Sequence, residues 1–300
     1  MSVTVPKACN LCPRQCGIDR NTATGYCGAG NTLRAARAAL HPWEEPCISG
    51  SDPQRGSGTV FFSGCTLGCI FCQNRDISHV NSGKDITPER LAEIFLKLQE
   101  KGAWNINLVT PTQYLPWILE ALDLAGERLT IPILYNSGGY ERVEILRMLE
   151  GTVDIYLPDL KYYDTALSAK YSGAADYFKV ASAAITEMVR QTGPVQFDES
   201  GMLHRGVIIR HLVLPGCHRD SIRLLGWIRE HFDPEMIRVS LMSQYTPPKE
   251  IACRELSRPV FTYEYRKVCE EAERLGLLGY TQERSSADAG FTPPFDGAGL

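Results

Sequence analysis

The chain has 300 residues, of which 44% are hydrophobic and 22% charged, and its formal net charge is −4. These values are typical of a globular protein with a substantial core. The charge is spread without a basic block, which argues against nucleic acid as the main partner. No apolar run approaches the roughly 20 residues that span a bilayer, and the first ten residues lack the features of a secretory signal. We therefore expect a cytoplasmic protein with no membrane partner.

Residues 1–50 contain several prolines and little periodicity, which predicts a small, loop-rich module. The module carries four clustered thiols. They could close a tetrahedral zinc site, hold a second iron–sulfur cluster, or carry no metal at all. These four cysteines are Cys9, Cys12, Cys16 and Cys27.

From residue 51 to about 280 the pattern alternates between strands and helices, which predicts a second domain. Six βα units in succession indicate a parallel sheet, as a complete or partial barrel or a doubly wound sheet. Residues 281–300 are expected to form a flexible tail. The predicted strands are 59–62, 104–109, 131–135, 153–157, 207–214 and 237–242, and the predicted helices lie near 87–101, 115–125, 140–149, 174–191, 220–231 and 262–275.

A second cysteine group directly follows the first predicted strand, in TVFFSGCTLGCIFCQN. Cys65, Cys69 and Cys72 have the spacing Cys-x3-Cys-x2-Cys, and short spacings let one loop wrap one iron–sulfur cluster. Three ligands leave one of four irons open for substrate, unlike a closed structural site. Parallel α/β folds place reactive loops at this end of a strand. The alternatives are three buried core cysteines, or a zinc site completed by a residue such as His79.

The other four cysteines are scattered. An odd total of eleven and the missing export signal argue against a disulfide framework. Cys47 is interpreted as an extra ligand or a substrate-facing thiol, whereas Cys217, Cys253 and Cys269 are expected to be packed thiols.

The loop at 65–72 resembles that of the radical SAM superfamily, whose signature is Cys-x3-Cys-x-aromatic-Cys, with Phe71 as the aromatic residue. The resemblance implies a [4Fe–4S] cluster whose open iron is chelated by S-adenosylmethionine (SAM). Reductive cleavage of SAM would then give methionine and a 5′-deoxyadenosyl radical that abstracts hydrogen.

The chain further resembles homologues of pyruvate formate-lyase activating enzyme, through GSGTVFFSGCTLGCIFCQNRDIS, NINLVTPTQY, DIYLPDLKYY and IIRHLVLPG. This resemblance implies a partial (β/α)6 barrel preceded by the cysteine-rich module. It also implies a glycyl radical enzyme as protein partner and an external electron donor such as flavodoxin or ferredoxin.

The same resemblance implies SAM-contacting residues at strand ends. Asp159 and Lys161 match an Asp-x-Lys that lies near SAM or a monovalent cation, and Arg210 matches an arginine that pairs with the SAM carboxylate. The family's Gly-Gly-Glu triplet is absent from the corresponding strand end. Considered alone, the Asp-x-Lys could be a solvated pair and Arg210 could bridge to a neighbouring strand. The remaining implied contacts are Phe71, Thr110, Pro111, Thr112 and Asn136.

The sequence thus predicts an activating-enzyme-like radical SAM oxidoreductase, without naming a catalytic side chain. One alternative keeps the cofactors and modifies a peptide or a small molecule. Another is a non-catalytic protein, either an iron–sulfur electron carrier or a zinc-stabilised binding module. The segment from Met242 to Tyr245 is a further candidate for facing the substrate.

Overall fold

The structure is a computed structural model that describes residues 5–52, 54–79, 82–248, 251, 253–282 and 292–300. Its strands are β1 (Leu33–His41), β2 (Gly56–Phe62), β3 (Lys84–Ile86), β4 (Ala103–Val109), β5 (Ile133–Ser137), β6 (Ile155–Pro158), β7 (Gln196–Phe197), β8 (Leu203–Leu212), β9 (Arg238–Met242) and β10 (Gly279–Thr281). Its helices are α1 (Pro46–Ser49), α2 (Arg75–Ser78), α3 (Pro88–Glu100), α4 (Leu115–Ala125), α5 (Val143–Leu146), α6 (Thr165–Ser172), α7 (Tyr177–Thr192), α8 (His218–His231) and α9 (Thr262–Arg274).

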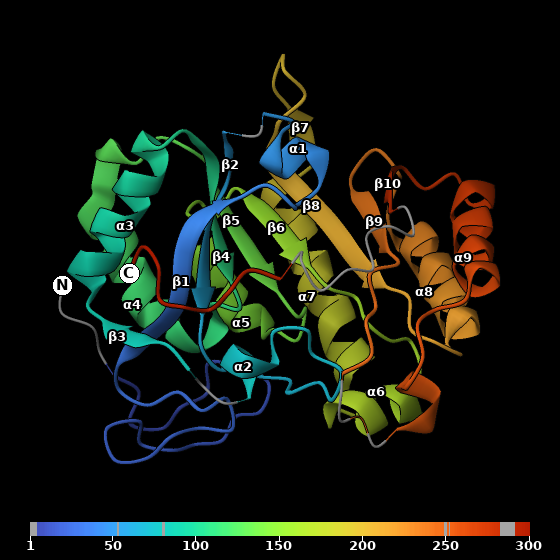
Figure 1. The fold of residues 1–300 in the computed structure, drawn as a ribbon, viewed down its shortest axis with the longest axis horizontal. Coiled ribbons are helices and arrows are strands. Elements are labelled where there is room, and N and C mark those ends of the chain that lie inside the picture. Colours follow the sequence, from blue (N-terminus) through green and yellow to red (C-terminus); the bar gives the residue numbers. More distant parts are fainter. Residues whose placement is uncertain (1–4, 53, 80–81, 249–250, 252, 283–291) are drawn as a thin grey trace.

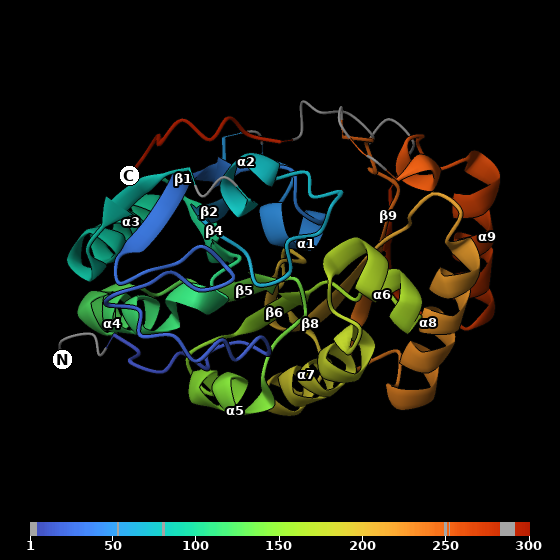
Figure 2. The same ribbon diagram turned by 90° about the horizontal axis from the view of Figure 1, so that it is seen from below.

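The strands form one curved sheet in the order β10-β9-β8-β6-β5-β4-β2-β1-β3 (Figure 1). Every neighbouring pair from β2 to β10 along this order is parallel, and β1 and β3 add an antiparallel edge. Helices follow the parallel strands and lie outside the curve (Figures 1 and 2). The prediction of an α/β fold built on a parallel sheet is confirmed.

The strand β2, which lies between β4 and β1 in the sheet, leads into the second group of cysteines. All seven of its residues are buried, as expected for a parallel strand covered on both faces. The helix α3 then covers the sheet and begins as predicted. Thr87 caps it by accepting a hydrogen bond from the Arg90 amide, Pro88 occupies its first turn, and Leu91 and Phe95 are among its buried residues.

The predicted loop-rich character of residues 1–50 is wrong for its second part. Residues 33–41 form β1, which pairs with β2 along most of its length, including Ala38 with Val60. Its sequence, LRAARAALH, is rich in alanine and arginine, which are helix formers rather than strand formers. Tertiary pairing with β2 overrides that preference.

The expected flexible tail also needs a correction. Its residues 283–291 lie outside the described residues, but residues 292–300 run along β1 (Figure 1). Gly297 N–H donates to Ala36 O at 2.9 Å, and Ala38 N–H donates to Ala298 O at 2.9 Å. These bonds pair the tail with β1 beyond the residues of β1 that pair with β3. The predicted helix at 140–149 is likewise shorter, because only α5 and a following 3-10 turn form there.

Within the described part of the chain, no helix is long and apolar enough to cross a membrane.

Candidate active site

The loop between β2 and α2 carries Cys65, Cys69 and Cys72, and all three residues line one cavity. The loop leaves the sheet at the carboxyl end of β2, where parallel α/β folds carry their reactive groups. Gly64 and Gly68 have φ values of 83° and 66°, a left-handed conformation that favours glycine and allows tight turns. The predicted placement of the three thiols at a strand end therefore agrees with the structure.

Each of these sulfurs accepts a hydrogen bond from a different part of the chain. Such donors stabilise a thiolate, which is the form of cysteine that ligates iron. The pairs are Leu67 N–H with Cys65 Sγ at 3.4 Å, Ser172 Oγ with Cys69 Sγ at 2.9 Å, and Ser78 Oγ with Cys72 Sγ at 3.2 Å.

The electrostatics of the loop favour a bound cationic group. Burial raises the pKa of Cys69, and burial together with the charges of Cys65 and Cys69 raises the pKa of Cys72 to about 12. Thiolates that share one loop repel one another, so they need positive charge between them. Among the described residues no group of three or more potential ligands is positioned to hold a metal ion. The three thiols nevertheless line one cavity, and cysteine thiolates are the usual ligands of an iron–sulfur cluster.

Phe71 links the cysteine loop to the rest of the cavity wall. Its buried ring meets Tyr162, Tyr171 and Tyr245 edge-on, at centroid distances of 6.2–6.4 Å. Tyr171 belongs to α6, and Tyr245 follows β9. The aromatic residue of the motif is thus a packing group that joins three segments around the loop.

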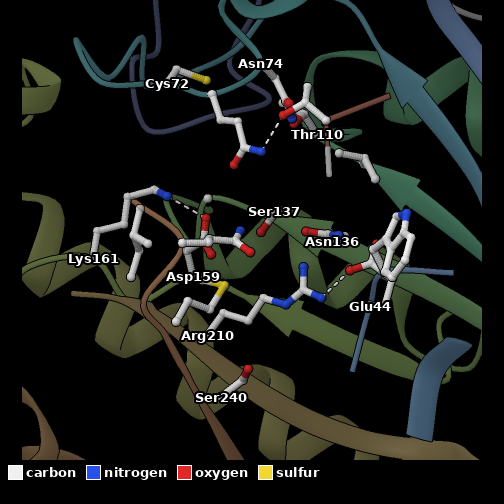
Figure 3. Close-up of a pocket in the computed structure, with 18 of the residues that line it drawn as sticks. Glu44, Cys72, Asn74, Thr110, Asn136, Ser137, Asp159, Lys161, Arg210 and Ser240 are labelled. Atoms are coloured by element: carbon white, nitrogen blue, oxygen red, sulfur yellow. Dashed lines mark hydrogen bonds and ion pairs between the residues drawn. The ribbon is translucent and has the colours of Figure 1, made fainter. Parts of the chain in front are cut away.

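The cavity has a volume of about 770 Å³, within the usual range for ligand sites. It lies at the carboxyl ends of the parallel strands, and Figure 3 shows polar side chains from several of them facing one another across it. Pro111 is not one of the lining residues. Those that line it from strand ends include Thr110, Thr112, Asn136, Ser137, Asp159, Lys161, Arg210 and Ser240.

The strand end at Thr110 is strained. Its φ is 57°, which is unusual for a residue other than glycine, and such outliers gather at functional sites. Thr110 N–H donates to Asn136 O at 2.8 Å, and Thr110 O accepts from Gln113 Nε2 at 2.9 Å. The carbonyl of Thr110 is therefore already engaged, whereas the side chain of Asn136 faces the cavity in Figure 3.

Thr112 connects the cavity to a buried acid that the sequence did not reveal. Its hydroxyl donates to Glu141 Oε1 at 2.8 Å, and the Tyr135 hydroxyl lies 3.4 Å from Glu141 Oε2. Burial raises the pKa of Glu141 to about 7. Thr112 therefore turns its hydroxyl toward Glu141, away from a ligand in the cavity.

Asp159 and Lys161 form an ion pair of 2.5 Å on the cavity wall (Figure 3). Their side chains are 25% and 16% exposed, so this is not the solvated pair of the alternative interpretation. Burial acts to lower the pKa of Lys161, but the charges of Asp159 and Cys69 raise it above its ordinary value. The site thus presents a fixed cation beside the cysteine loop.

Arg210 lies in the cavity, but its guanidinium is already paired. It donates from Nε to Glu45 Oε1 at 2.9 Å and from Nη2 to Glu45 Oε2 at 2.5 Å, and it also contacts Glu44. Burial acts to raise the pKa of Glu45, but the charge of Arg210 lowers it below its ordinary value. The expected bridge to a neighbouring strand is not what the structure contains, because both partners lie between β1 and α1, and pairing with the SAM carboxylate stays a prediction.

Glu44 and Glu45 are cavity residues that sequence reasoning missed. They lie in HPWEEPC, between β1 and α1, and Asn107 Nδ2 donates to Glu44 Oε1 at 2.8 Å. The only signal was two adjacent acids in an otherwise apolar segment. The candidate segment after β9 was better placed, since Met242, Gln244 and Tyr245 line the cavity.

The N-terminal cysteines lie outside this cavity, in loops at the same end of the sheet as α2 (Figures 1 and 2). Cys9 and Cys12 are buried, Cys27 is partly buried and Cys16 is exposed. Burial raises the pKa of Cys12 to about 12 and also raises that of Cys27. Metal binding by these four residues stays a prediction.

The scattered cysteines are packed thiols. Cys47 is buried in α1 and does not line the cavity, so neither proposed role for it gains support. Burial raises its pKa to about 11. Cys217, Cys253 and Cys269 pack against the core, as expected.

Fold and site together define a parallel α/β protein with a three-thiol loop on a strand-end cavity. Residues 59–197 match the Radical SAM superfamily. The chain is also 31% identical over 283 residues to the uncharacterized protein MJ0674 of Methanocaldococcus jannaschii, covering 90% of this chain and 76% of that protein. The chain belongs to the radical SAM superfamily, and membership implies a [4Fe–4S] cluster and SAM.

Solved structures with a similar fold include SuiB of Streptococcus suis bound to the precursor peptide SuiA and methylornithine synthase (PylB). The SuiB match has 15% identity and a TM-score of 0.48, and covers 73% of this chain but 46% of SuiB. The PylB match has 17% identity and a TM-score of 0.48, and covers 72% of this chain and 68% of PylB. The chain therefore spans about half the length of SuiB.

Proposed function

We propose that this protein cleaves SAM reductively and uses the resulting 5′-deoxyadenosyl radical to abstract a hydrogen atom from a glycine of a partner polypeptide. The observation that carries the proposal is the three-thiol loop at the end of β2, on a cavity of about 770 Å³. The cluster, when bound, supplies one electron to the SAM sulfonium. The proposal extends the resemblance to activating enzymes that the sequence motifs indicate.

The chain's own residues would divide the remaining work. Cys65, Cys69 and Cys72 hold the cluster, and the aromatic wall around Phe71 excludes water from it. Asn136 and the Asp159–Lys161 pair line the same cavity as the three thiols, which supports a role for them in contacting SAM. A SAM carboxylate at Arg210 would have to compete with Glu44 and Glu45, so we assign this contact only as a proposal.

A polypeptide substrate is favoured over a small molecule by the amide side chains of the cavity. Gln73, Gln244 and Gln282 line it from the cysteine loop, the segment after β9 and the residue after β10. Primary amides both donate and accept, which matches the peptide group, although Gln282 Nε2 already donates to Gln244 Oε1 and Gln73 Nε2 donates to Thr292 Oγ1. The reductant is proposed to be an external carrier such as flavodoxin or ferredoxin. Radical modification of a peptide or a small molecule remains the second candidate.

The N-terminal cysteines are proposed to hold a second metal, either zinc or an iron–sulfur cluster. The sulfurs of Cys16 and Cys27 lie 3.4 and 3.5 Å from the position that a Cβ would take at Gly25. This proximity supports the proposal for at least two of the four thiols. Metal analysis of protein lacking Cys65, Cys69 and Cys72 would test it, with neither zinc nor iron as the contrary result.

The function is tested with anaerobically reconstituted protein, dithionite and SAM. We expect iron and sulfide to be incorporated and 5′-deoxyadenosine to form. A candidate glycyl radical enzyme with deuterated glycine is then added. Breakage of the glycine C–D bond should transfer deuterium to 5′-deoxyadenosine and leave an organic radical on the partner. SAM cleavage without any deuterium transfer would favour the second candidate, and no SAM cleavage would contradict the proposal as a whole.

A further inference from the structure

Arg14, between Cys12 and Cys16, joins the N-terminal module to two other parts of the chain. Its guanidinium donates to carbonyls of the cysteine loop and to carbonyls at the end of α6. A helix leaves its last carbonyls without intrahelical donors, so this cation also suits the end of α6. The four bonds are Nε to Thr66 O at 3.0 Å, Nη2 to Leu67 O at 3.3 Å, Nη2 to Ser172 O at 2.9 Å and Nη1 to Gly173 O at 2.6 Å.

The local backbone and two rings fix the direction of Arg14. The turn that follows it places Gln15 at a φ of 39°, and Gln15 N–H donates to Cys12 O at 3.0 Å. The guanidinium lies 4.2 Å from the ring centre of Tyr26 and 5.4 Å from that of Tyr140. A guanidinium with a fixed plane can serve several carbonyls at once, which a lysine ammonium cannot do in the same geometry.

Other contacts of the module reach the same loop. The Tyr26 hydroxyl donates to Leu67 O at 3.1 Å, and Cys65 N–H donates to Cys27 O at 3.2 Å. The N-terminal cysteine segment is therefore bound directly to the backbone that carries the second cysteine group. A displacement of Arg14 or Tyr26 would therefore break hydrogen bonds to the backbone of the cysteine loop.

The hydrogen bonds from Arg14 to the end of α6 lie next to the sulfur of Cys69. Ser172, whose carbonyl accepts from Arg14, donates its hydroxyl to Cys69 Sγ at 2.9 Å, and it shares a 2.7 Å hydrogen bond with the Tyr162 hydroxyl. Ile70 N–H also donates to Tyr171 O at 2.9 Å. Hydrogen bonds to the cysteine sulfurs of an iron–sulfur cluster stabilise its more negative, reduced state and raise its potential.

We propose that Arg14 is a positioning residue for the cluster: it holds the cysteine loop against the end of α6, so that the Ser172 hydroxyl stays on Cys69 Sγ and keeps the reduction potential high. The N-terminal module thereby acts on the reactive cluster, whatever it binds itself. This inference rests on the proposed function, because it requires a cluster on Cys65, Cys69 and Cys72.

The test compares Arg14→Lys and Ser172→Ala with wild-type protein after anaerobic reconstitution. Redox titration followed by electron paramagnetic resonance measures the midpoint potential. We expect both variants to retain iron and sulfide. We also expect both to become harder to reduce, with an equilibrium constant for one-electron reduction about tenfold lower, equivalent to about 59 mV. Ser172→Thr keeps the hydroxyl and should restore most of the potential.

The matched control is Arg142→Lys. Arg142 Nη1 also donates to a carbonyl of the module, Asn10 O, at 2.6 Å, and no hydrogen bond joins it to the cysteine loop within the described residues. The variant Arg142→Lys should leave the midpoint potential unchanged. In metal-free protein, amide hydrogen exchange of residues 64–72 should be faster in Arg14→Lys than in Arg142→Lys, a difference that does not depend on the loaded enzyme.

Each result separates the inference from the proposed function. If wild-type protein takes up no cluster, the proposed function fails. If the cluster is intact in Arg14→Lys and its potential and loop exchange equal those of the control, the positioning role is wrong. Should Arg14→Lys not fold, Tyr26→Phe removes a single donor to Leu67 O, and an unchanged potential in that variant would overturn the proposal. A shift in Ser172→Ala alone would likewise exclude the role of Arg14.

Discussion

The cavity has two unlike walls, and Figure 3 labels Cys72, Asp159 and Lys161 of one and Glu44 and Arg210 of the other. The cluster wall consists of Cys65, Cys69 and Cys72 with the Asp159–Lys161 pair, and the opposite wall consists of Trp43, Glu44, Glu45 and Arg210.

The cluster wall is built from one loop and one strand end. The opposite wall joins distant parts of the sequence, because Arg210 is 165 positions from Glu45 and 166 positions from Glu44. On the cluster wall, burial raises the pKa of Cys69 and Cys72, which favours their thiol form. The opposite wall pairs two carboxylates, Glu44 and Glu45, with the single guanidinium of Arg210. One wall thus presents thiols to the cavity, whereas the other contains a largely buried ion-pair network.

The largest effect is expected on the cluster wall. Cys65→Ala, Cys69→Ala and Cys72→Ala should each abolish reductive SAM cleavage, because the loss of one of three thiolates leaves an iron poorly ligated. The measurement is 5′-deoxyadenosine formed per protein after reconstitution. Cys269→Ala, which removes a packed thiol of α9, is the control and should leave SAM cleavage intact. Full 5′-deoxyadenosine formation by a variant that lacks all three thiols would contradict the assignment of the cluster to this wall.

The next effect is expected on the opposite wall. Arg210→Met leaves Glu44 and Glu45 buried without their partner, and an unpaired buried charge costs about 3–5 kcal/mol of the free energy of unfolding. Urea denaturation of cluster-free protein measures this loss. The control, Arg90→Met, breaks a pair whose side chains are 35% and 60% exposed and should cost less than about 1 kcal/mol.

The opposite outcome for Arg210 would be equally informative. If Arg210→Met unfolds like wild-type protein but binds SAM at least tenfold more weakly, the guanidinium serves the SAM carboxylate and the opposite wall is not self-contained. A tenfold loss corresponds to about 1.4 kcal/mol of binding free energy.

The difference between the walls also explains what could be predicted from the sequence. The cysteine loop could be predicted because its three cysteines and its glycines are close together in the sequence and follow a buried apolar strand. Asp159 and Lys161 were reached through a local motif. Glu44 and Glu45 were not, because their role depends on Arg210, which only the sheet order brings near them.

The fold shows the same limit. The parallel strands β2, β4, β5, β6, β8 and β9 follow from local periodicity and were predicted near their observed positions, whereas the short strand β10 and the helix α6 were not predicted. The strand β1 was missed because LRAARAALH has no strand propensity of its own and gains its conformation from pairing with β2. Likewise, the path of residues 292–300 along β1 depends on backbone hydrogen bonds that leave no trace in the sequence pattern.

The smallest effect is expected beneath the cluster wall, at Glu141. Burial raises its pKa from the ordinary 4.5 to about 7, so the folded protein binds a proton more tightly there than the unfolded chain does. Between about pH 4.5 and 7 the folded state therefore holds more protons, and the contribution of this group to stability falls as the pH rises. At about 1.36 kcal/mol per pKa unit the loss amounts to roughly 3 kcal/mol.

Glu141→Gln removes this titration but keeps an oxygen that can accept from Thr112. The free energy of unfolding of cluster-free protein, measured by urea at pH 5 and pH 8, should therefore change less with pH in Glu141→Gln than in wild-type protein. Any stability that the new amide costs equally at pH 5 and pH 8 cancels in the difference between the two free energies of unfolding. Glu100→Gln, at the exposed end of α3, should retain the wild-type difference. If Glu141→Gln also retains it, the buried acid is ionised at neutral pH and the polar network below Thr112 is more hydrated than the structure indicates.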